Sequence, residues 1–201
     1  MLNPCMPPLP PDVIARAQAL SCSLLLDGAK AIGLFLPGGG CLPHAIRPVN
    51  PAHKMAGTAL TVRTQIGDNR PIHLAIYGAK QPGYALVIDG HAHEDCAYMG
   101  DLMMGACKAL GFAGVVINGY IRDWDGVTVC SGDLVMGDRD GVCVIPREHV
   151  EAVLEAAEKR KAYEEARQAV IDEYVKAKEA GETLPDLTPA WAKEVLERIN
   201  P

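Results

Sequence analysis

The sequence is poor in aromatic residues and has no long apolar run. Phe, Trp and Tyr make up 5% of its 201 residues, and its apolar runs are short, such as residues 24–26 and 33–36. A helix that crosses a membrane needs about 20 consecutive apolar residues. The N-terminus also lacks the charged and then apolar pattern of a secretory leader. We therefore expect a cytoplasmic protein without a membrane partner.

Positive charge is also scarce. The formal net charge is −6, and basic residues do not cluster in the first 145 positions. Because nucleic-acid-binding proteins usually carry a basic patch or stripe, we expect no nucleic-acid partner. The apolar fraction of 49% and the charged fraction of 22% are ordinary for a globular protein. The length fits one domain, or one domain with an extension.

Paired cysteine motifs are missing. The number of cysteines is odd, and no two of them form a C-x-x-C pair. Several lie in apolar runs, which indicates reduced and mostly buried thiols. The glycine run at 38–40 is followed by no Gly-Lys-Ser/Thr motif, so we do not interpret it as a phosphate-binding loop.

What the sequence does contain is a strand–helix–strand pattern. YALVID (84–89) and AGVVIN (113–118) are apolar and β-branched, as buried strands are. Gly111 is expected to end the helix between them. This order predicts a right-handed βαβ unit with parallel strands, whose ligand-binding edge combines the helix N-terminus and the loops after both strands. The predicted buried face of the helix consists of Leu102, Met103, Ala106 and Leu110.

Chemically useful residues are expected at this edge. Asp101 opens the helix, and Arg122 and Asp123 follow the second strand. The first turn of a helix leaves backbone N–H groups unpaired, here those of residues 102–104, and they suit a carboxylate or a phosphate. Arg122 can hold a carboxylate with two hydrogen bonds. Asp123 is a hard oxygen ligand for Mg²⁺, which would polarise the carbonyl of a 2-oxo acid and stabilise an enolate.

Two ordinary explanations compete with such a site. Asp101 can be a plain helix N-cap, the commonest reason for an aspartate at that position. An Arg-Asp pair after a strand is often a surface ion pair that contributes little to stability.

The rest of the first 146 residues predicts a mixed α/β domain. We expect a helix over 12–27 with Asp12 as its N-cap, a strand over 54–65 and a short helix over 71–79. The Asp-Gly turns at 124–126 and 138–141 are typical of hairpins. The sheet is therefore expected to be mixed and barrel-like, with further short strands at 127–129, 134–136 and 142–145.

A long charged helix is expected to follow. We therefore divide the chain into an α/β domain at 1–146 and a C-terminal helical extension at 147–201. A second short helix is expected from Thr188, because a capping residue is followed there by Pro189. The apolar stripe of the long helix is predicted to contain Val150, Val153, Leu154, Ala157, Tyr163, Ala166, Val170 and Tyr174.

The stretch GDLMMGACKALGFAGVVINGYIRD (100–123) resembles the signature of the RraA-like family. That signature pairs an acidic residue with Arg-Asp after twenty intervening residues, and the same spacing separates Asp101 from Arg122 here. The resemblance covers most of residues 12–170. Further similar motifs are AGTALTV (56–62), GDN (67–69), PGYALVIDG (82–90) and SGDLVMGDRDGVCVIP (131–146).

The resemblance implies an RraA-like swivelling β/β/α domain with a mixed, barrel-like sheet and a C-terminal helical extension. It implies a class II, metal-dependent lyase that cleaves a C–C bond of a 2-oxo acid and releases pyruvate through a metal-stabilised enolate. The reactions would be cleavage of 4-hydroxy-4-methyl-2-oxoglutarate and decarboxylation of oxaloacetate. The alternative is a non-catalytic regulator that, like RraA, binds a ribonuclease or another protein.

Carried over by position, the resemblance gives each residue a role. Asp123 would bind Mg²⁺ or Mn²⁺, and Asp101 would order a metal-bound water and assist proton transfer. The pyruvyl group would be held by Gly100, Leu102, Met103 and Arg122.

The resemblance also implies an assembly. Family members are trimers or hexamers with sites between subunits, and a glutamate of the neighbouring C-terminal helix reaches the water shell of the metal. Glu164 is the best match for that glutamate, and Glu165 is the alternative. A solvated helix face is the ordinary explanation for both.

The resemblance breaks after Asp123. Family members carry an extra strand and loop before the Ser-Gly-Asp motif, whereas WDGVTV (124–129) follows at once here. Asp125 also stands one position before the family's acidic residue, and Gly126 takes that place. Two interpretations stay open: a chain truly shortened at this point, or a sequence from which residues have been left out.

Two other chemistries are weaker alternatives. The loop GHAHEDC (90–96) contains residues that bind zinc, but no third histidine is placed by spacing. We expect this loop to line the substrate pocket. A Schiff-base lysine would also support aldol chemistry, but no apolar strand flanks Lys30, Lys54, Lys80 or Lys108.

Overall fold

The computed structural model describes residues 6–43, 46, 48, 50, 52–79, 81–91, 97–118 and 132–189. The chain divides into two compact units, Met1–Glu158 and Lys159–Pro201. Each unit is described by itself below. Every strand among the described residues belongs to the first unit.

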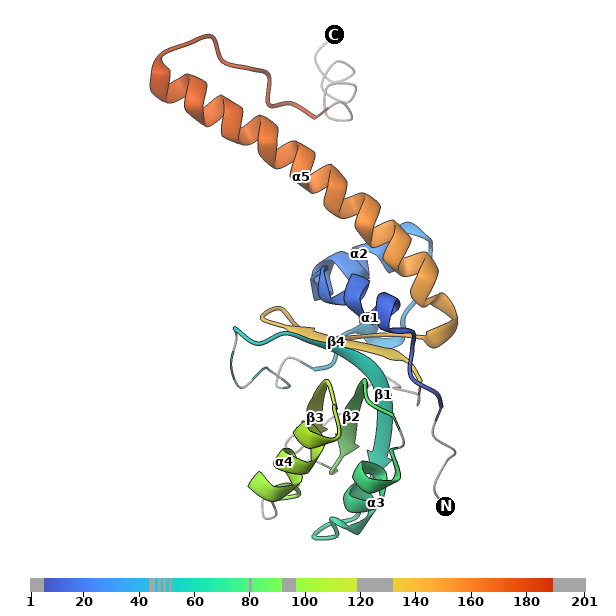
Figure 1. Cartoon of the computed structure of the whole chain (residues 1–201). Coiled ribbons are helices and arrows are strands. Elements are labelled where there is room, and N and C mark those ends of the chain that lie inside the picture. Colours follow the sequence, from blue (N-terminus) through green and yellow to red (C-terminus); the bar gives the residue numbers. More distant parts are fainter. Residues whose placement is uncertain are drawn as a thin grey trace. The chain divides into compact units, whose positions relative to one another are not determined.

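A mixed five-stranded sheet forms the centre of the first unit (Figure 1). The strands β1, β2 and β3 run parallel, whereas β4 is antiparallel to both β1 and β5. The sheet curls into a half-barrel, so the predicted mixed, barrel-like fold is confirmed. The strand order is β3 (Gly114–Asn118), β2 (Tyr84–Asp89), β1 (Met55–Arg63), β4 (Leu134–Asp138) and β5 (Gly141–Ile145).

The strand β1 belongs to both halves of this sheet. Its first residues pair with β4 and its last residues pair with β2, and the two pairings overlap at Thr58, which faces Tyr84 on one side and Leu134 on the other. Thr58 is fully buried. Its Oγ1 accepts a hydrogen bond from the Leu9 N–H at 2.7 Å, which ties the N-terminal arm to the middle of the strand.

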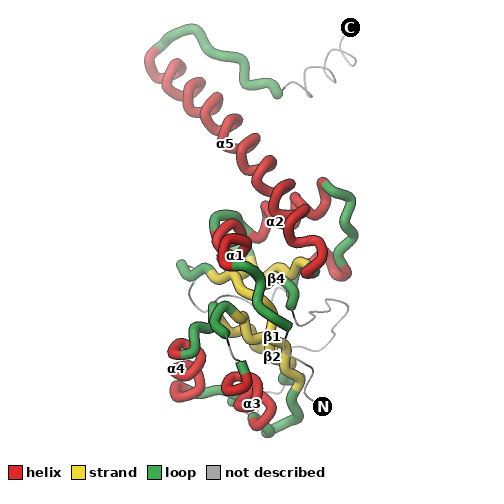
Figure 2. Tube along the Cα trace, turned by 45° about the vertical axis from the view of Figure 1, so that its right-hand side comes forward, coloured by secondary structure: helices red, strands yellow, loops and turns green. Residues whose placement is uncertain are grey.

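Helices cover one face of each half of the sheet (Figure 2). Helices α1 (Pro11–Gln18) and α2 (Cys22–Ala31) and the first turns of α5 (Val150–Ala180) pack on the antiparallel half. Helices α3 (Arg70–Gly78) and α4 (Asp101–Ala109) pack on the parallel half. The opposite face is lined mainly by small and β-branched residues, among them Ala59, Ala85, Val116, Val135 and Val144.

The N-terminal helical region differs from the prediction. One helix over 12–27 is wrong, because the chain breaks into α1, which follows Pro10, and α2, which Ser21 caps. The Ser21 hydroxyl accepts a hydrogen bond from the Leu24 N–H at 3.2 Å. A serine side chain that satisfies an open backbone N–H starts a new helix. Apolar periodicity alone does not reveal such a restart.

The βαβ unit is as predicted, except for the buried face of its helix. The strands β2 and β3 are parallel, and Gly111, with φ 76°, follows the end of α4. Met103 is 6% exposed, whereas Leu102 is 91% exposed and Leu110 is 39% exposed. Placing Leu102 and Leu110 on the buried face was wrong. The buried row of α4 runs through Met103 and Cys107, and Leu102 lies about 100° around the helix from it.

The strands β4 and β5 form the predicted hairpin around DRDG (138–141), with Asp138 paired to Gly141. Asp138 is buried. Its carboxylate accepts hydrogen bonds from the Cys22 N–H and the Asp140 N–H, both at 2.9 Å. It therefore joins the hairpin turn to the start of α2. The predicted turn at 124–126 and strand at 127–129 lie outside the described residues.

The first turns of α5 belong to the first unit and bury the predicted residues Val150, Val153, Leu154 and Ala157. Gly28 of α2 allows a close approach here. A Cβ atom on Gly28 would lie 2.7 Å from the Val153 carbonyl oxygen and 2.8 Å from the Ala157 nitrogen.

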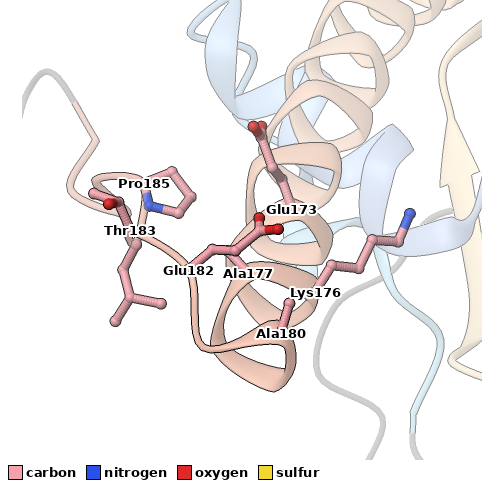
Figure 3. A pocket seen from close by; sticks show the side chains of 8 residues that line it. Glu173, Lys176, Ala177, Ala180, Glu182, Thr183 and Pro185 are labelled. Atoms are coloured by element: carbon pink, nitrogen blue, oxygen red, sulfur yellow. The ribbon is translucent and has the colours of Figure 1, made fainter.

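The second unit contains the rest of α5 and the segment after it. The predicted apolar stripe is wrong at Tyr163, which is 43% exposed, and at Ala166, which is also exposed, whereas Val170 and Tyr174 are half-buried. A pocket lies between the end of α5 and the following segment (Figure 3), and none of its lining residues belongs to the predicted site. The short helix expected from Thr188 falls mostly outside the described residues.

No helix within the described ranges combines the length and the apolar character that a membrane crossing requires.

Candidate functional site

The N-terminus of α4 is the first part of the candidate site. Gly100 is the N-cap and Asp101 is the first helical residue, so the interpretation of Asp101 as a plain N-cap is wrong. The Gly100 carbonyl oxygen accepts hydrogen bonds from the N–H groups of Met103 and Met104, each at 3.0 Å. The expectation of open amides is therefore wrong for these two. The Leu102 N–H has no partner among the described residues and can bind an anion.

The side chains of this turn point in different directions. Met103 is buried against the parallel strands, whereas Leu102 is almost fully exposed. A ligand at this helix end would therefore meet the backbone of Leu102.

Three polar residues lie side by side where the parallel strands end. The register pairs Arg63 of β1 with Asp89 of β2, and Asp89 with Asn118 of β3. Because side chains alternate along a strand, all three lie on the sheet face opposite α3 and α4. We call Arg63, Asp89 and Asn118 the polar row. No sequence motif marks this row, although each member is a polar residue at the end of an apolar strand.

The Asp89 carboxylate is held from two sides. Its Oδ2 accepts a hydrogen bond from Arg63 Nε at 3.1 Å, and its Oδ1 accepts one from the His91 N–H at 3.2 Å. His91 has φ 53°, a left-handed conformation that is uncommon outside glycine. The chain thus turns sharply after β2, and the turn fixes the position of Asp89.

Gly90 allows close packing at the same edge. Its N–H donates to the Asn118 carbonyl oxygen at 3.1 Å, and its own carbonyl oxygen accepts from the Tyr98 hydroxyl at 2.9 Å. A Cβ atom at this position would lie 2.7 Å from the Tyr98 ring and 2.9 Å from the Asn118 carbonyl oxygen. A side chain at position 90 would therefore force β2, β3 and the approach to α4 apart.

Asn118 carries an unused hydrogen-bond acceptor. The residue is 6% exposed. Its Oδ1 is the buried side-chain polar atom that lacks a hydrogen-bond partner in the described part of the chain. Burying such an atom without a donor is unfavourable and therefore uncommon. Among the described residues, this edge of the sheet supplies no donor for Asn118 Oδ1.

The other predicted site residues cannot be placed at this edge. Arg122 and Asp123 lie outside the described residues, as does the side chain of Asp101. Glu164 is on the part of α5 in the second unit, where it accepts a hydrogen bond from Arg160 Nε at 3.0 Å. Its neighbour Glu165 lies 3.9 Å from Lys161 Nζ.

The described residues give no support to a zinc site in the loop at 90–96 or to a Schiff-base lysine. Most of the loop at 90–96 lies outside them, and within them no three His, Cys, Asp or Glu side chains gather as a metal site. The Lys54 ammonium donates a hydrogen bond to the Leu20 carbonyl oxygen, which is a structural contact.

The described cysteines are free thiols, and Cys22, Cys107 and Cys143 are buried. A hydrogen bond with Cys22, together with burial, raises the pKa of Cys143 well above its ordinary value. Burial also raises the pKa of Cys107. A raised pKa keeps the thiols of Cys107 and Cys143 protonated and unreactive. The prediction of mostly buried, free thiols is confirmed for Cys22, Cys107 and Cys143, whereas Cys41 is exposed.

Comparison with known families matches residues 34–127 to the RraA-like family, described as Aldolase/RraA. The matched region ends within the segment where the sequence departs from the family pattern.

Two relatives illustrate the likeness in sequence. A Halalkalibacterium halodurans protein named "Putative 4-hydroxy-4-methyl-2-oxoglutarate aldolase" is 35% identical over 202 residues, covering 83% of this chain and 91% of the relative. Because 83% of a 201-residue chain is fewer than 202 residues, the relative has extra residues inside the matched region. A Burkholderia multivorans protein of the same name is 34% identical over 82 residues, covering 41% of this chain and 49% of the relative.

Two solved structures share the fold. Streptomyces coelicolor RraAS2, described as an unusual member of the RNase ES inhibitor RraA family, has a TM-score of 0.65 at 15% identity, covering 80% of this chain and 98% of its own. A protein described among novel cellulases from gut-associated microbes has a TM-score of 0.66 at 20% identity, covering 82% and 91%. At these identities the likeness concerns the fold alone.

Proposed function

This chain belongs to the RraA-like (Aldolase/RraA) family, and we propose that it is a metal-dependent lyase that cleaves a C–C bond of a 2-oxo acid and releases pyruvate. The names of its relatives support an aldolase. The proposed reactions are retro-aldol cleavage of 4-hydroxy-4-methyl-2-oxoglutarate and decarboxylation of oxaloacetate. The observation that carries the proposal is the open Leu102 N–H at the start of α4, at the edge where β2 and β3 end.

The chain's own residues would bind and orient the pyruvyl half of the substrate. The Leu102 N–H would donate to its carboxylate, helped by the positive end of the helix dipole. The Met103 N–H would donate to the same carboxylate after giving up its hydrogen bond to the Gly100 carbonyl oxygen. Arg122 would hold the same carboxylate with two parallel hydrogen bonds. Asp101 would move a proton to the carbon from which the other half departs.

Asp123 is the proposed ligand of a divalent metal. The side-chain oxygens that this edge supplies among the described residues, on Asp89 and Asn118, are of the donor type that Mg²⁺ and Mn²⁺ prefer. One or two carboxylates with waters and substrate oxygens are sufficient for Mg²⁺. When bound, the ion would supply Lewis-acid polarisation of the 2-oxo group.

The proposed assembly is a homotrimer or homohexamer with sites between subunits. Glu164 of the partner subunit, or Glu165, would then approach the metal through water. Within one chain Glu164 pairs with Arg160 on an exposed helix surface. Such a pair contributes little to stability, so its exchange for a site contact costs little.

The test is pyruvate release by the purified full chain. The protein is incubated with oxaloacetate or 4-hydroxy-4-methyl-2-oxoglutarate and Mg²⁺, and pyruvate is measured by coupling to lactate dehydrogenase. We expect EDTA to abolish release, and added Mg²⁺ or Mn²⁺ to restore it. No EDTA-sensitive release on either substrate would overturn the proposal.

One variant locates the chemistry. Asp123→Ala should lose metal-dependent activity and keep the native circular dichroism spectrum. Full activity of the Asp123→Ala variant would contradict the proposal that Asp123 binds the metal.

A further inference from the structure

The proposed contacts to the pyruvyl half of the substrate do not involve the polar row. We propose that Arg63, Asp89 and Asn118 form a second subsite, which takes the half of the substrate beyond the cleaved bond. Its ligand would be a carboxylate with a hydroxyl group on the adjacent carbon. The identity of the complete substrate rests on the proposed function, but the subsite can be tested without turnover.

Arg63 supplies the carboxylate-binding group. Its Nε is used by Asp89, and its two Nη groups have no hydrogen-bond partner among the described residues. The side chain is 79% exposed, so a ligand can reach it. A guanidinium edge of this kind matches the two oxygens of a carboxylate.

Asp89 acts as a positioning residue for Arg63. Its carboxylate bridges the His91 N–H and Arg63 Nε, so the sharp turn after β2 sets the direction of the guanidinium. An exposed ion pair contributes little to the free energy of unfolding. The free energy of unfolding therefore does not account for the Arg63–Asp89 ion pair. Orientation of Arg63 toward a ligand does account for it.

Asn118 supplies the second half of the recognition. Its buried Oδ1 lacks a donor, and a hydroxyl group of a ligand would provide one after a turn about the soft terminal torsion of the side chain. Adjacent strands are about 4.8 Å apart, so the backbones of Arg63 and Asn118 are about 10 Å apart. A small hydroxy acid, together with the long Arg63 side chain, can span that distance.

The two groups together select the chemistry of the ligand. A plain carboxylate would satisfy Arg63 but leave Asn118 without a donor. An amine would satisfy Asn118 but be repelled by the Arg63 charge. A hydroxy carboxylate satisfies both, and this is the group at the far end of a 4-hydroxy-2-oxo diacid.

Direct binding tests the subsite alone. The probe is 2-hydroxyisobutyrate, which has the hydroxyl and carboxylate groups but no 2-oxo group, and its Kd is measured by calorimetry or ligand-observed NMR on the full chain. We expect Arg63→Gln and Asn118→Leu to raise the Kd at least tenfold. The matched control is Arg139→Gln, another exposed arginine (83%) in the β4–β5 turn, and it should bind as the wild type does.

A second probe separates the two contacts. Isobutyrate lacks the hydroxyl group, so Asn118→Leu should bind it as well as the wild type does, whereas Arg63→Gln should not. Equal binding of 2-hydroxyisobutyrate by the wild type and Arg63→Gln, or no binding by the wild type, overturns the subsite.

Kinetics link the subsite to catalysis. Arg63→Gln should lower kcat/KM ten- to hundredfold on 4-hydroxy-4-methyl-2-oxoglutarate. It should leave kcat/KM unchanged on 4-hydroxy-4-methyl-2-oxopentanoate, in which a methyl group replaces the far carboxylate. Equal losses on both substrates overturn the subsite but not the lyase. If the wild type cleaves neither, the lyase proposal fails and the binding result still decides the subsite.

Melting temperature distinguishes a binding role of Asn118 from a structural one. Leucine has a similar size and removes the unpaired acceptor, so Asn118→Leu should melt at or above the wild-type temperature. If Asn118→Leu melts at a lower temperature and binds both 2-hydroxyisobutyrate and isobutyrate more weakly, Asn118 has a structural role. That result overturns its role in the subsite.

Discussion

The Arg16 guanidinium on α1 binds the Glu158 carboxylate on α5 through two parallel hydrogen bonds, Nε to Oε1 at 2.8 Å and Nη2 to Oε2 at 3.1 Å. Arg16 Nη1 also donates to Glu151 Oε2 at 2.6 Å. One arginine thus fastens the first turns of α5 to α1. The hydrogen bond from Arg16 lowers the pKa of Glu158 below its ordinary value.

Glu158→Gln should weaken this attachment in a pH-dependent way. Because the pKa is lowered in the folded state, the stabilisation is present at neutral pH and is lost as the pH falls through the lowered pKa. Both side chains are partly exposed, at 31% and 41%. We therefore expect a loss of about 0.5–1 kcal/mol at pH 7 and a smaller loss at pH 3. Urea unfolding at both pH values measures it.

The control for this prediction is Glu155→Gln. Glu155 is an exposed residue of α5, and its replacement should change the free energy of unfolding by less than about 0.5 kcal/mol at either pH. A Glu158→Gln deficit of the same size at pH 7 and pH 3 would contradict the role of the carboxylate charge.

Two glycines in helices should respond oppositely to alanine. At Gly28 the added methyl group would meet backbone atoms of α5 at 2.7 and 2.8 Å, whereas at Gly105 of α4 it would meet nothing within 4 Å. Gly28→Ala should cost about 1–3 kcal/mol by overpacking. Gly105→Ala should stabilise by up to about 1 kcal/mol through helix propensity. Equal effects in thermal unfolding would be inconsistent with close contact at Gly28.

Asp138→Ala should destabilise the first unit strongly. It removes a buried carboxylate that accepts hydrogen bonds from the Cys22 and Asp140 N–H groups, and it leaves the Cys22 N–H unsatisfied. The expected loss is about 2–3 kcal/mol. Asp140→Ala, in the same turn but more exposed, should cost less than about 1 kcal/mol. Urea unfolding that ranks the two variants in the reverse order would refute this account of the turn.

Leu102→Pro tests the proposed anion-binding role of the Leu102 amide. Leu102 is the second residue of α4, and its N–H makes no helical hydrogen bond, so proline removes the donor without breaking the helix. The chain already has a proline, Pro71, at the second position of α3. We expect a ten- to hundredfold loss in kcat/KM, as for the removal of one hydrogen bond to a charged group, about 1.5–3 kcal/mol.

The control is Leu102→Ala, which keeps the amide and shortens an exposed side chain. It should retain wild-type activity, and both variants should keep the helical circular dichroism signal. An equal loss in the two variants would assign the effect to the side chain and exclude the amide.

The parallel half of the fold was predictable from the sequence because its signals are local. The runs at 84–89 and 113–118 are apolar on both faces, as strands buried on both sides must be. The β4–β5 hairpin was predictable because DRDG lies between two apolar runs. The restart at Ser21 and the outward side chain of Leu102 were missed, because a cap or a quarter turn of a helix changes burial without changing composition.

The site was predictable only in part. The position of α4 beside the ends of β2 and β3 follows from topology, and the sequence placed Gly100 and Leu102 there. The polar row was not foreseeable, because its members are 26 and 29 residues apart and meet only through strand register. The unpaired Oδ1 of Asn118 is a property of the packed edge that no motif encodes.

The pairing of β1 has a consequence for how this protein can change. Residues before Thr58 pair with the hairpin beneath α1, α2 and α5, and residues after it pair with the strand that leads to Asp89. Substitutions in the first stretch therefore act on the packing of the antiparallel half, and substitutions in the second stretch act on the strand pair that carries Arg63 and Asp89. Thr58 belongs to both pairings, so its replacement would disturb both halves of the sheet.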